Sequence, residues 1–327
     1  FTYGLVKPRG IAFDDSNNLW IVDQSANSLY VVIDNDKDGF AEENLLVDSS
    51  LDSPHGLEYY LGDLYVGEKS QISVYRDITS EGTYSSKEII VPDLPFDGHT
   101  SKTVRIGPDE RLYVASGSSC NVCEESDPRR AAISVYNLDG SNHSIYASGL
   151  RNTVDFAFYG GKIWGVNNGR DQIGDDVPPE EVNIIEEGEH YGWPYCYGQG
   201  ITNPEYPEKE DFCRNEAIGS TYDMQAHSAP LGMDFFPTNT SFPDSLNENM
   251  FIGFHGSWNR TVPTGYKIVR LNIFDRNAET INFITGWLDP ESGEAWGRPV
   301  DVKFDHNGDM YISDDKAGVV YRVTYID

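Results

Sequence analysis

Carboxylates at alternate positions distinguish the stretch DNDKDGFAEE, residues 34–43. Hard cations such as calcium prefer oxygen ligands, and the glycine after the alternating acids permits the sharp turn of a metal-binding loop. An EF-hand would have a glutamate where this chain has Leu45, so the stretch is not an EF-hand. We expect a structural calcium site here; the alternative is a solvated acidic hairpin tip. The predicted ligands are Asp34, Asp36, Asp38 and Glu43, with Glu42 as an alternative to Glu43.

A second polar stretch, VNNGRDQIGDDVPPEEVNII, covers residues 166–185 between two segments that have the composition of strands. Such a run belongs on a loop, and its Asn168–Gly169 pair favours a tight turn. The acids of this loop have no simple metal-ligand spacing. The reason for so much charge in one loop must therefore come from the rest of the chain.

Polar neighbours surround His99 in the stretch DGHTSK, so this histidine does not belong to an apolar face. It stands just before a strand-like segment that begins at Thr103. A neutral imidazole in that place is suited to general-base chemistry. The alternative, a histidine with a surface or structural role, stays open at this point.

Arginine recurs in this chain directly before apolar segments. The chain has only 24 Lys and Arg residues against 53 Asp and Glu residues, so the recurrence is unexpected. Guanidinium groups fit carboxylates and phosphates, and a ring of them predicts a polyanionic ligand. The alternative is a set of scattered surface ion pairs. The arginines are Arg9, Arg151 (followed by Asn152), Arg260 and Arg298.

The elements that must position these residues form an internal repeat. Each copy has an apolar strand, a tight turn such as DHNGD or GPDE, a second strand, a polar loop and a third strand. The repeat predicts an all-β fold, a six-bladed β-propeller that forms one domain over residues 1–327; the alternative is a β-sandwich. Loops 117–130, 168–230 and 255–266 are expected to build its site. The copies begin at Arg9, His55, Thr103, Thr153, Leu231 and Pro299.

Charge and cysteine content limit the partners and the compartment. With a net charge of −29, the chain repels nucleic acid and anionic membranes, and no apolar stretch is long enough for membrane insertion. The chain starts without Met, which is consistent with a removed leader. Its cysteines predict the disulfides Cys120–Cys123 and Cys196–Cys213 by proximity, with a zinc site as the alternative. Disulfides imply an oxidising, extracytoplasmic setting, secreted or periplasmic. Predicted N-glycosylation acceptors are Asn142, Asn239 and Asn259.

Several long stretches together resemble the soluble PQQ-dependent sugar dehydrogenases, in particular the sorbosone and pyranose dehydrogenase group. They are GHTSKTVRIGPDERLYVASG, HGSWNRTVPTGYKIVRL, GRPVDVKFDHNGDMYISDDKAGVVYRV and the specific block that runs from NGRD through PPEEVN to YGWPYC. The similarity covers nearly the whole chain. It implies a propeller that holds pyrroloquinoline quinone (PQQ) on its axis, with a calcium ion that bridges PQQ to main-chain carbonyls. Because PQQ carries three carboxylates, this implication agrees with the expected ring of arginines.

The resemblance also assigns roles to residues. It makes His99 the base that removes the C1 hydroxyl proton of a cyclic aldose while hydride passes to PQQ, with calcium as Lewis acid. It makes the carbonyls of Gly169 and Arg170 calcium ligands, which explains the tight turn at Asn168. Glu180 and Glu181 could set the local charge or bind a second calcium. The expected cofactor contacts are Arg151, Asn152, Asn168 and Arg298 by resemblance, Arg9 and Arg260 by their place in the repeat, and Trp258. Trp258 and Tyr191 could stack on the sugar or on PQQ, with a role in the core as the alternative.

The chain also departs from the family pattern. Soluble glucose dehydrogenases support the base with an aspartate where this chain has ASGSSC and Ser118 stands nearest, so its orientation and the identity of the sugar are open. No haem-attachment motif is present, so electrons must leave to a separate acceptor such as a cytochrome, a quinone or a dye, or to a domain outside this sequence. Two other functions stay open. They are a calcium-dependent propeller hydrolase such as a lactonase, and a non-catalytic binding module.

Overall fold

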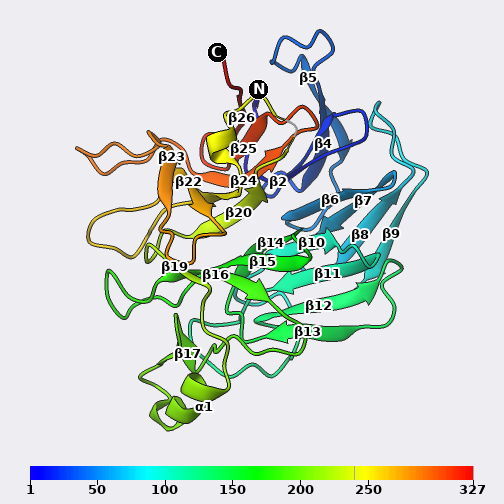
Figure 1. The fold of residues 1–327 in the computed structure, drawn as a ribbon. Coiled ribbons are helices and arrows are strands. Elements are labelled where there is room, and N and C mark those ends of the chain that lie inside the picture. Colours follow the sequence, from blue (N-terminus) through cyan, green and yellow to red (C-terminus); the bar gives the residue numbers. More distant parts are fainter. Residues whose placement is uncertain (239, 327) are drawn as a thin grey trace.

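Six antiparallel sheets of four strands each surround a common axis (Figure 1). The computed structural model describes residues 1–238 and 240–326, so the predicted glycosylation acceptor Asn239 lies outside the described residues. The predicted six-bladed propeller is therefore confirmed. None of the described helices is long and apolar enough to cross a membrane.

Every blade runs outward from an innermost strand at the axis. Blade 1 has β2 (Pro8–Phe13), β3 (Leu19–Asp23), β4 (Ser28–Ile33) and β5 (Glu43–Asp48), and blade 2 has β6 (Gly56–Tyr60), β7 (Asp63–Gly67), β8 (Ile72–Arg76) and β9 (Ser86–Val91). Blade 3 has β10 (Lys102–Ile106), β11 (Arg111–Ser116), β12 (Ala132–Asn137) and β13 (Ser144–Ser148), and blade 4 has β14 (Thr153–Tyr159), β15 (Lys162–Asn167), β16 (Glu180–Ile185) and β19 (Tyr222–Met224). Blade 5 has β20 (Pro230–Phe235), β21 (Asn249–Phe254), β22 (Lys267–Asn272) and β23 (Ile281–Ile284), and blade 6 has β24 (Pro299–Phe304), β25 (Met310–Asp314), β26 (Val319–Val323) and β1.

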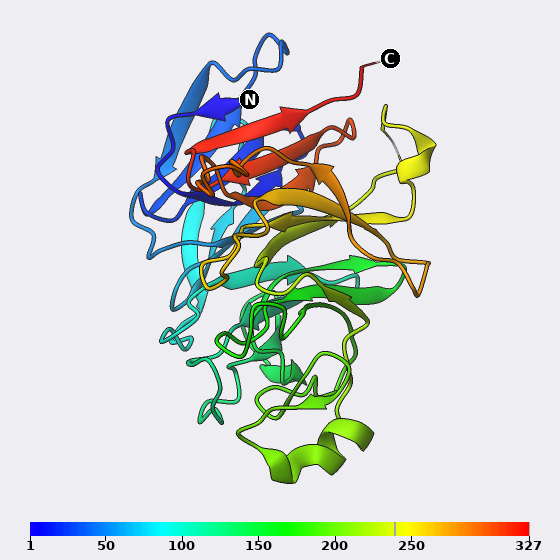
Figure 2. The same cartoon turned by 90° about the vertical axis from the view of Figure 1, so that its left-hand side faces the viewer.

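The N-terminal strand β1 (Thr2–Tyr3) closes the ring as the outermost strand of blade 6, where it pairs with β26 (Figure 2). The repeat in the sequence predicted three strands per copy, and the structure adds this fourth strand to each blade. The outer strands escaped the prediction because they are more exposed: in β5, for example, all six residues are exposed or only partly buried. A strand without a buried face lacks the alternation of apolar and polar residues that identifies strands.

The hydrophobic core is divided among the gaps between the blades. Each of the six main clusters of buried apolar side chains in the described part takes its members from two neighbouring blades. Both faces of each inner strand are therefore buried, as in β3, where all five residues are buried. This explains why the second strand of a blade, such as LWIVD in β3, is largely apolar.

Short elements connect or extend the blades. An insertion between β16 and β19 contains a small hairpin and the α-helix, and the predicted disulfide Cys196–Cys213 connects the two. The other predicted disulfide, Cys120–Cys123, is also present. The described cysteines are thus all bonded, which excludes the zinc alternative. The insertion has β17 (Cys196–Tyr197), β18 (Ile201–Thr202), the 3-10 helix η1 (Pro207–Lys209) and α1 (Glu210–Asn215), and blade 5 contains the 3-10 helix η2 (Asp244–Leu246).

Carboxylates on the innermost strands join one blade to the next. Each accepts a hydrogen bond from a main-chain N–H of the innermost strand that follows around the ring. These bonds satisfy backbone donors that face the axis and have no strand partner on that side. Asp155, Asp234 and Asp301 accept at 3.0 Å from the N–H groups of Met233, Phe304 and Ile11, respectively.

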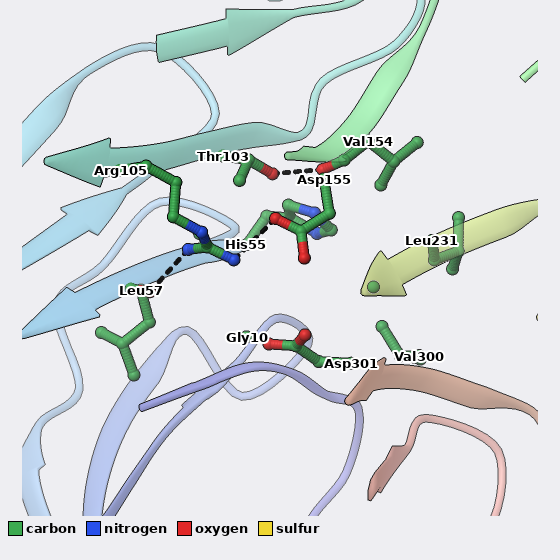
Figure 3. A pocket seen from close by; sticks show the side chains of 12 residues that line it. Gly10, His55, Leu57, Thr103, Arg105, Val154, Asp155, Leu231, Val300 and Asp301 are labelled. Carbon is green, nitrogen blue, oxygen red and sulfur yellow. Dashed lines mark hydrogen bonds and ion pairs between the residues drawn. The ribbon is translucent and has the colours of Figure 1, made fainter. Parts of the chain in front are cut away.

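The guanidinium of Arg105 supplies positive charge to this buried acidic ring (Figure 3). Its Nη2 donates to Asp155 Oδ1 at 2.6 Å, and its other nitrogens donate to the carbonyls of Leu57 (3.1 Å), Val104 (2.9 Å) and Phe156 (3.1 Å). The cavity that remains on the axis has a volume of about 20 Å³, which is room for about one water molecule. A ligand of several rings therefore cannot enter the axis at this depth and must lie on a loop face.

Removal of the Arg105 side chain tests whether this ring holds the blades together. Arg105→Ala would leave the buried Asp155 with only the more distant Lys303 ammonium, at 3.6 Å, and we expect it to lower the free energy of unfolding by about 3–5 kcal/mol. Urea denaturation measures the loss. The matched control is Arg214→Ala on α1, which removes an ion pair whose side chains are 65% and 63% exposed and should change stability by less than about 0.5 kcal/mol. Equal effects of the two substitutions would contradict the assignment.

Candidate active site

One edge of the propeller collects the polar residues that the sequence singled out. Neighbouring strands within a blade are antiparallel, so each innermost strand begins at the edge where the second strand ends. His99 stands shortly before β10, and Arg151 and Asn152 stand directly before β14. The loops 117–130, 168–230 and 255–266 each begin where a second strand ends, at β11, β15 and β21. All these residues therefore face the same end of the axis.

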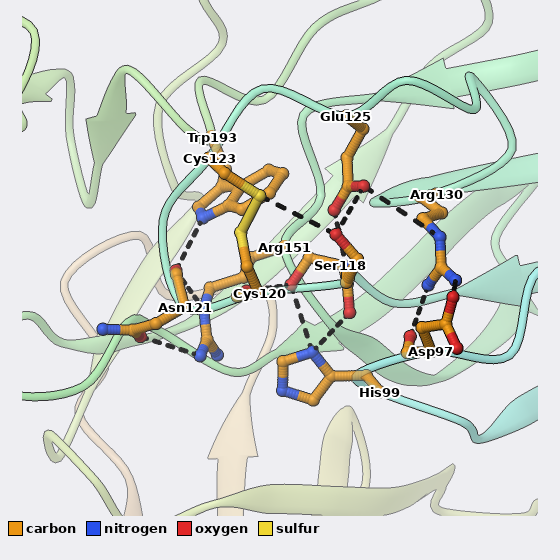
Figure 4. The surroundings of a disulfide bond; sticks show 11 residues. Asp97, His99, Ser118, Cys120, Asn121, Cys123, Glu125, Arg130, Arg151 and Trp193 are labelled. Carbon is orange, nitrogen blue, oxygen red and sulfur yellow. Dashed lines mark hydrogen bonds and ion pairs between the residues drawn. A yellow bond between two sulfur atoms is a disulfide. The ribbon is translucent and has the colours of Figure 1, made fainter.

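The ring of His99 is held by Ser118 (Figure 4). Its Nδ1 lies 3.0 Å from the carbonyl oxygen and 3.1 Å from the hydroxyl oxygen of Ser118. The carbonyl can only accept, and the Ser118 hydroxyl already donates to the carbonyl of Cys120 at 2.7 Å. Nδ1 must therefore carry the hydrogen, which leaves the lone pair on Nε2. Ser118 thus orients the imidazole at the place where the glucose dehydrogenases have an aspartate.

His99 is neutral near pH 7. Burial, and after it the positive charge of Arg151, lower its pKa to about 4. Because Ser118 carries no charge, its bonds do not hold the imidazolium as a carboxylate would. The site therefore contains an uncharged histidine with a free Nε2 lone pair, which is the protonation state that a general base requires.

Arg151 lies across the start of the polar loop. Its Nη1 donates to the carbonyls of Gly169 at 2.7 Å and Asn168 at 3.2 Å, and its Nη2 lies 3.4 Å from Asp171 Oδ2. The two carbonyls converge on a positively charged group. A hard cation prefers such a pair of oxygen donors.

The buried carboxylate of Glu180 holds the backbone of this loop in place. Glu180 accepts from the N–H of Gly169 at 2.7 Å and from the N–H of Ala229 at 3.0 Å. The first bond orients the peptide between Asn168 and Gly169 and so aims the Asn168 carbonyl. Burial raises the pKa of Glu180 to about 7, although both backbone bonds act in the opposite direction.

Asn152 lies between the base and the loop. Its Nδ2 lies 3.3 Å from Asn168 Oδ1, while its own Oδ1 is buried and has no hydrogen-bond partner among the described residues. A Cβ atom at Gly117 would come within 2.4 Å of this Oδ1 and 2.6 Å of the His99 Cβ, so the close approach requires glycine there. A buried acceptor without a partner favours a ligand group that donates to it.

The opposite side of the mouth is a groove of about 810 Å³, within the roughly 300–1,000 Å³ of small-molecule sites. Arg298 donates to the carbonyls of His255 (3.1 Å) and Gly256 (2.7 Å) and forms no ion pair with a carboxylate of the described residues. Burial, and after it the charge of Arg9, lower the pKa of Lys7, which shows that cations crowd here. The side chains that line the groove include Lys7, His255, Tyr266, Arg298, Asp315 and Lys316.

Arg9 reaches this groove through Asp315. Its Nη1 lies 2.8 Å from Asp315 Oδ2, and its Nε donates to His55 Nδ1 at 3.3 Å. His255 Nε2 lies 2.8 Å from the other oxygen of Asp315. Burial lowers the pKa of His255 to about 4, so its neutral ring donates to Asp315. Burial alone would raise the pKa of Asp315, but the His255 bond and the Arg9 charge hold it well below its usual range.

The side chains of Arg260 and Arg170 point away from this group, whereas the stacking role of Trp258 stays a prediction. Arg260 points to the acidic loop, where it donates to the carbonyl of Asp175 at 2.6 Å and pairs with Asp176 at 2.9 Å. The Arg170 side chain turns toward the insertion, where it pairs with Glu205 at 2.5 Å, so only its main chain belongs to the loop. The Trp258 side chain is 69% exposed. The acids of the polar loop thus have a partial explanation, because they are partners for arginines.

The DNDKDGFAEE loop lies on the outer side of blade 1, between β4 and β5. Carboxylate oxygens of Asp34, Asp36 and Glu42 lie within 4.8 Å of one another, while Asp38 and Glu43 do not belong to that group. Glu43 is instead the first residue of β5. The loop is thus far in the fold from the mouth, in keeping with a structural role for any cation it binds.

Sequence reasoning missed two contributors to the site. One is Asn121, and a signal existed, since it stands inside the predicted disulfide loop. The other is the His255–Asp315 pair, whose members come from blades 5 and 6 and carry no shared spacing in the sequence. Tyr191, which the sequence left between a stacking and a core role, is a core residue whose hydroxyl donates to the carbonyl of Ile184 at 2.6 Å.

Comparisons with known proteins agree on one family. The family model described as TrAA12-like matches residues 1–325. An uncharacterized protein of Borreliella burgdorferi is 32% identical, over 98% of this chain and 86% of the relative. A pyrroloquinoline quinone-dependent pyranose dehydrogenase of Coprinopsis cinerea is 23% identical over 98% of this chain, which spans about half (52%) of that protein. The calcium structure of a Trichoderma reesei protein of carbohydrate-active enzyme family AA12 has a TM-score of 0.82 at 22% identity, and covers 98% of this chain and 93% of its own.

The protonation state of His99 can be measured directly. We expect its imidazole to titrate near pH 4 rather than near 6.5, so that the ring is neutral at pH 5.5 with hydrogen on Nδ1. Histidine NMR of the labelled protein, assigned by the loss of one signal in His99→Gln, gives both the pKa and the tautomer. A titration midpoint at or above pH 6.5 would show that burial does not act on this ring as argued.

Proposed function

The chain belongs to the TrAA12-like family, and from that membership together with the geometry at the mouth we propose that it is a PQQ-dependent dehydrogenase of sugars. The finer part of the proposal is oxidation of a cyclic aldose at C1, with His99 as the base. The observation that carries it is the neutral His99, whose Nε2 lone pair is free at an edge where unpaired cations gather. The name of the Coprinopsis relative supports the cofactor and the substrate class.

The chemistry of the mouth fits a cofactor with several carboxylates. Arg298 and Lys7 line the groove without carboxylate partners among the described residues, and the buried Oδ1 of Asn152 offers an acceptor. We assign the binding of PQQ to Arg151, Asn152, Asn168 and Arg298. Arg9 would support this set by its ion pair with Asp315, which lines the same groove. When bound, PQQ supplies the acceptor for the hydride of the sugar.

The carbonyl pair at Asn168 and Gly169 fits a calcium ion, with the Arg170 carbonyl as a further donor that the family resemblance suggests. Oxygen donors of this kind suit a hard cation, and the calcium structure of the Trichoderma relative supports this choice of cation. When bound, calcium would act as a Lewis acid toward the quinone. Arg151 now occupies the space in front of both carbonyls, so it must share them or turn toward the cofactor.

His99 then carries the proton step. Its Nε2 accepts the proton of the C1 hydroxyl as the C1–H bond gives up its hydride, and the C1–O bond becomes a carbonyl. The bond from Nδ1 to Ser118 keeps the lone pair on Nε2 until that nitrogen takes the proton, and it continues to hold the imidazolium afterwards. The product of a cyclic aldose is thus a lactone, and the proton on His99 returns to solvent at the mouth.

The proposed partners follow from this reaction. The substrate is a sugar, and the proposed electron acceptor is a separate cytochrome or quinone or a domain outside this sequence. The two disulfides support an extracytoplasmic place, secreted or periplasmic. The lactonase alternative gives no reason for the cations Arg298 and Lys7 beside the groove.

Loss of the base should abolish activity without loss of the cofactor. We expect His99→Ala to reduce the kcat for PQQ- and calcium-dependent dye reduction with aldoses by about 10²–10⁴-fold. We also expect the acid limb of kcat/KM for the native enzyme to lie near pH 4, since the base is inactive only when protonated. Stabilisation by PQQ, measured as a rise in Tm, should persist in the variant.

Two outcomes would count against the proposal. If PQQ in calcium buffer neither raises the Tm nor supports dye reduction with any aldose, the quinoprotein assignment fails. If His99→Ala keeps the native kcat, the base lies elsewhere. His306→Ala, in the β24–β25 turn at the other end of the strands, is the matched histidine control.

The acidic loop of blade 1 remains a proposed second calcium site. Calcium alone should raise the Tm of the cofactor-free protein, and the double variant Asp34→Asn with Asp36→Asn should lose most of that rise because two of three grouped carboxylates lose their charge. Calorimetry with added calcium measures it, with Asp139→Asn in an exposed turn as the control. An unchanged rise in the double variant would refute this site, and sugar oxidation should be unaffected either way.

A further inference from the structure

The disulfide Cys120–Cys123 closes a four-residue loop directly after the residues that hold His99 (Figure 4). Ser118, which orients the His99 ring, donates its own hydroxyl proton to the carbonyl of Cys120 at 2.7 Å. The covalent closure limits the positions that this carbonyl can take. The loop therefore supports the hydrogen bond on which the tautomer of His99 depends.

Asn121, inside the loop, holds the guanidinium of Arg151 with two of its atoms. Arg151 Nε donates to the main-chain carbonyl of Asn121 at 3.1 Å, and Nη2 donates to the side-chain Oδ1 at 3.1 Å. Only Nη1 of the same group reaches the carbonyls of Asn168 and Gly169. A planar guanidinium held at two nitrogens has a fixed plane, so Asn121 decides which way the third nitrogen points.

The same amide also pairs with the polar loop. The N–H of Asp171 donates to Asn121 Oδ1 at 2.8 Å, and Asn121 Nδ2 donates to the carbonyl of Asp171 at 3.1 Å. The indole of Trp193 adds a bond to the main-chain carbonyl of Asn121 at 3.2 Å. Asp171 follows the carbonyl pair at residues 168–169 by two positions, so Asn121 ties that turn to blade 3.

The far end of the disulfide loop is anchored to the segment that carries His99. Glu125 accepts from Ser119 at its N–H (2.6 Å) and hydroxyl (2.8 Å), and lies 4.0 Å from Arg130. Arg130 in turn donates to the carbonyl of Asp97 at 2.5 Å, two residues before His99. The loop is thus connected to the proposed base on both sides and to the proposed cofactor arginine through Asn121.

We propose that the Cys120–Cys123 loop couples the two halves of the site, and that Asn121 is a positioning residue for Arg151 and for the carbonyls at residues 168–169. The inference rests on the proposed function and adds to it a residue that touches neither the sugar nor the cofactor. Without the Asn121 side chain, Arg151 Nη2 loses its bond to Oδ1 and the Asp171 N–H loses its acceptor, so neither the guanidinium nor the turn is held in one position. Asn121 therefore favours binding of calcium and an anionic cofactor by fixing Arg151 and the two carbonyls in place before binding.

The test compares Asn121→Ala with Asn137→Ala, a control at the end of β12 in the same blade whose side-chain amide donates to the hydroxyl of Ser141. In the cofactor-free protein, amide hydrogen exchange at residues 168–173 should rise at least tenfold in Asn121→Ala and stay native in the control. The Kd for PQQ in calcium buffer should rise about 10–100-fold, as it does when a residue that holds a ligand-binding side chain by a hydrogen bond is removed. At saturating PQQ, the kcat should fall less than the affinity.

The disulfide gives a second comparison. The double variant Cys120→Ser with Cys123→Ser should weaken PQQ binding in the same way, while Cys196→Ser with Cys213→Ser, which opens the insertion instead, should lower the Tm and leave the PQQ Kd native. Native exchange and a native Kd in Asn121→Ala overturn the inference. A native protein that does not bind PQQ refutes the proposed function instead, and the exchange result then still decides whether Asn121 orders the turn.

Discussion

The structure depends on carboxylates that face the axis of the propeller and accept main-chain hydrogen bonds from the next blade. Hydrophobic contacts between blades are non-directional, so they hold neighbouring blades together without setting the register between them. The bond from Met233 N–H to Asp155 sets that register for blades 4 and 5, and equivalent bonds from Asp234 and Asp301 do so around the ring. The positive charge of Arg105 offsets the repulsion among these buried carboxylates.

This constraint also decides where chemistry takes place. Since side chains fill the axis to a cavity of about 20 Å³, the ring excludes ligands from the centre and leaves the mouth as the place for binding. At the mouth, positively charged side chains gather, although the molecule as a whole is strongly negative. The chain has a net charge of −29, yet Lys7, Arg9 and Arg298 gather beside one groove. Burial in the same region removes the charge of His99 and of His255.

The residues at the mouth are held by layers of support behind them. Ser118 holds His99, Glu180 holds the Gly169 amide, and Asn121 holds Arg151. These supports come from blades 3 and 4 and stand 11 to 30 positions along the chain from the groups they hold. A site of this kind resists small displacements, which matter because rates and affinities fall steeply when reacting groups move by about 1 Å. The serine at His99 also shows how one neutral residue can orient a base whose pKa stays low, because burial and the charge of Arg151 outweigh the upward effect of the Ser118 bond.

The sequence by itself determined the number of blades, the closed disulfides and the identity of His99, Arg151, Asn152 and Arg298 as residues of the mouth. It could do so because turns, strand periodicity and cysteine proximity are local properties, and because residues at the same place in each repeat come to the same edge. Only the tertiary structure decided that Arg260 serves the acidic loop, that Asp315 joins Arg9 to His255, and that Asn121 reaches Arg151 and Asp171. Those contacts connect residues up to 306 positions apart, and their partners depend on how neighbouring blades turn toward one another. No spacing along the chain records that angle.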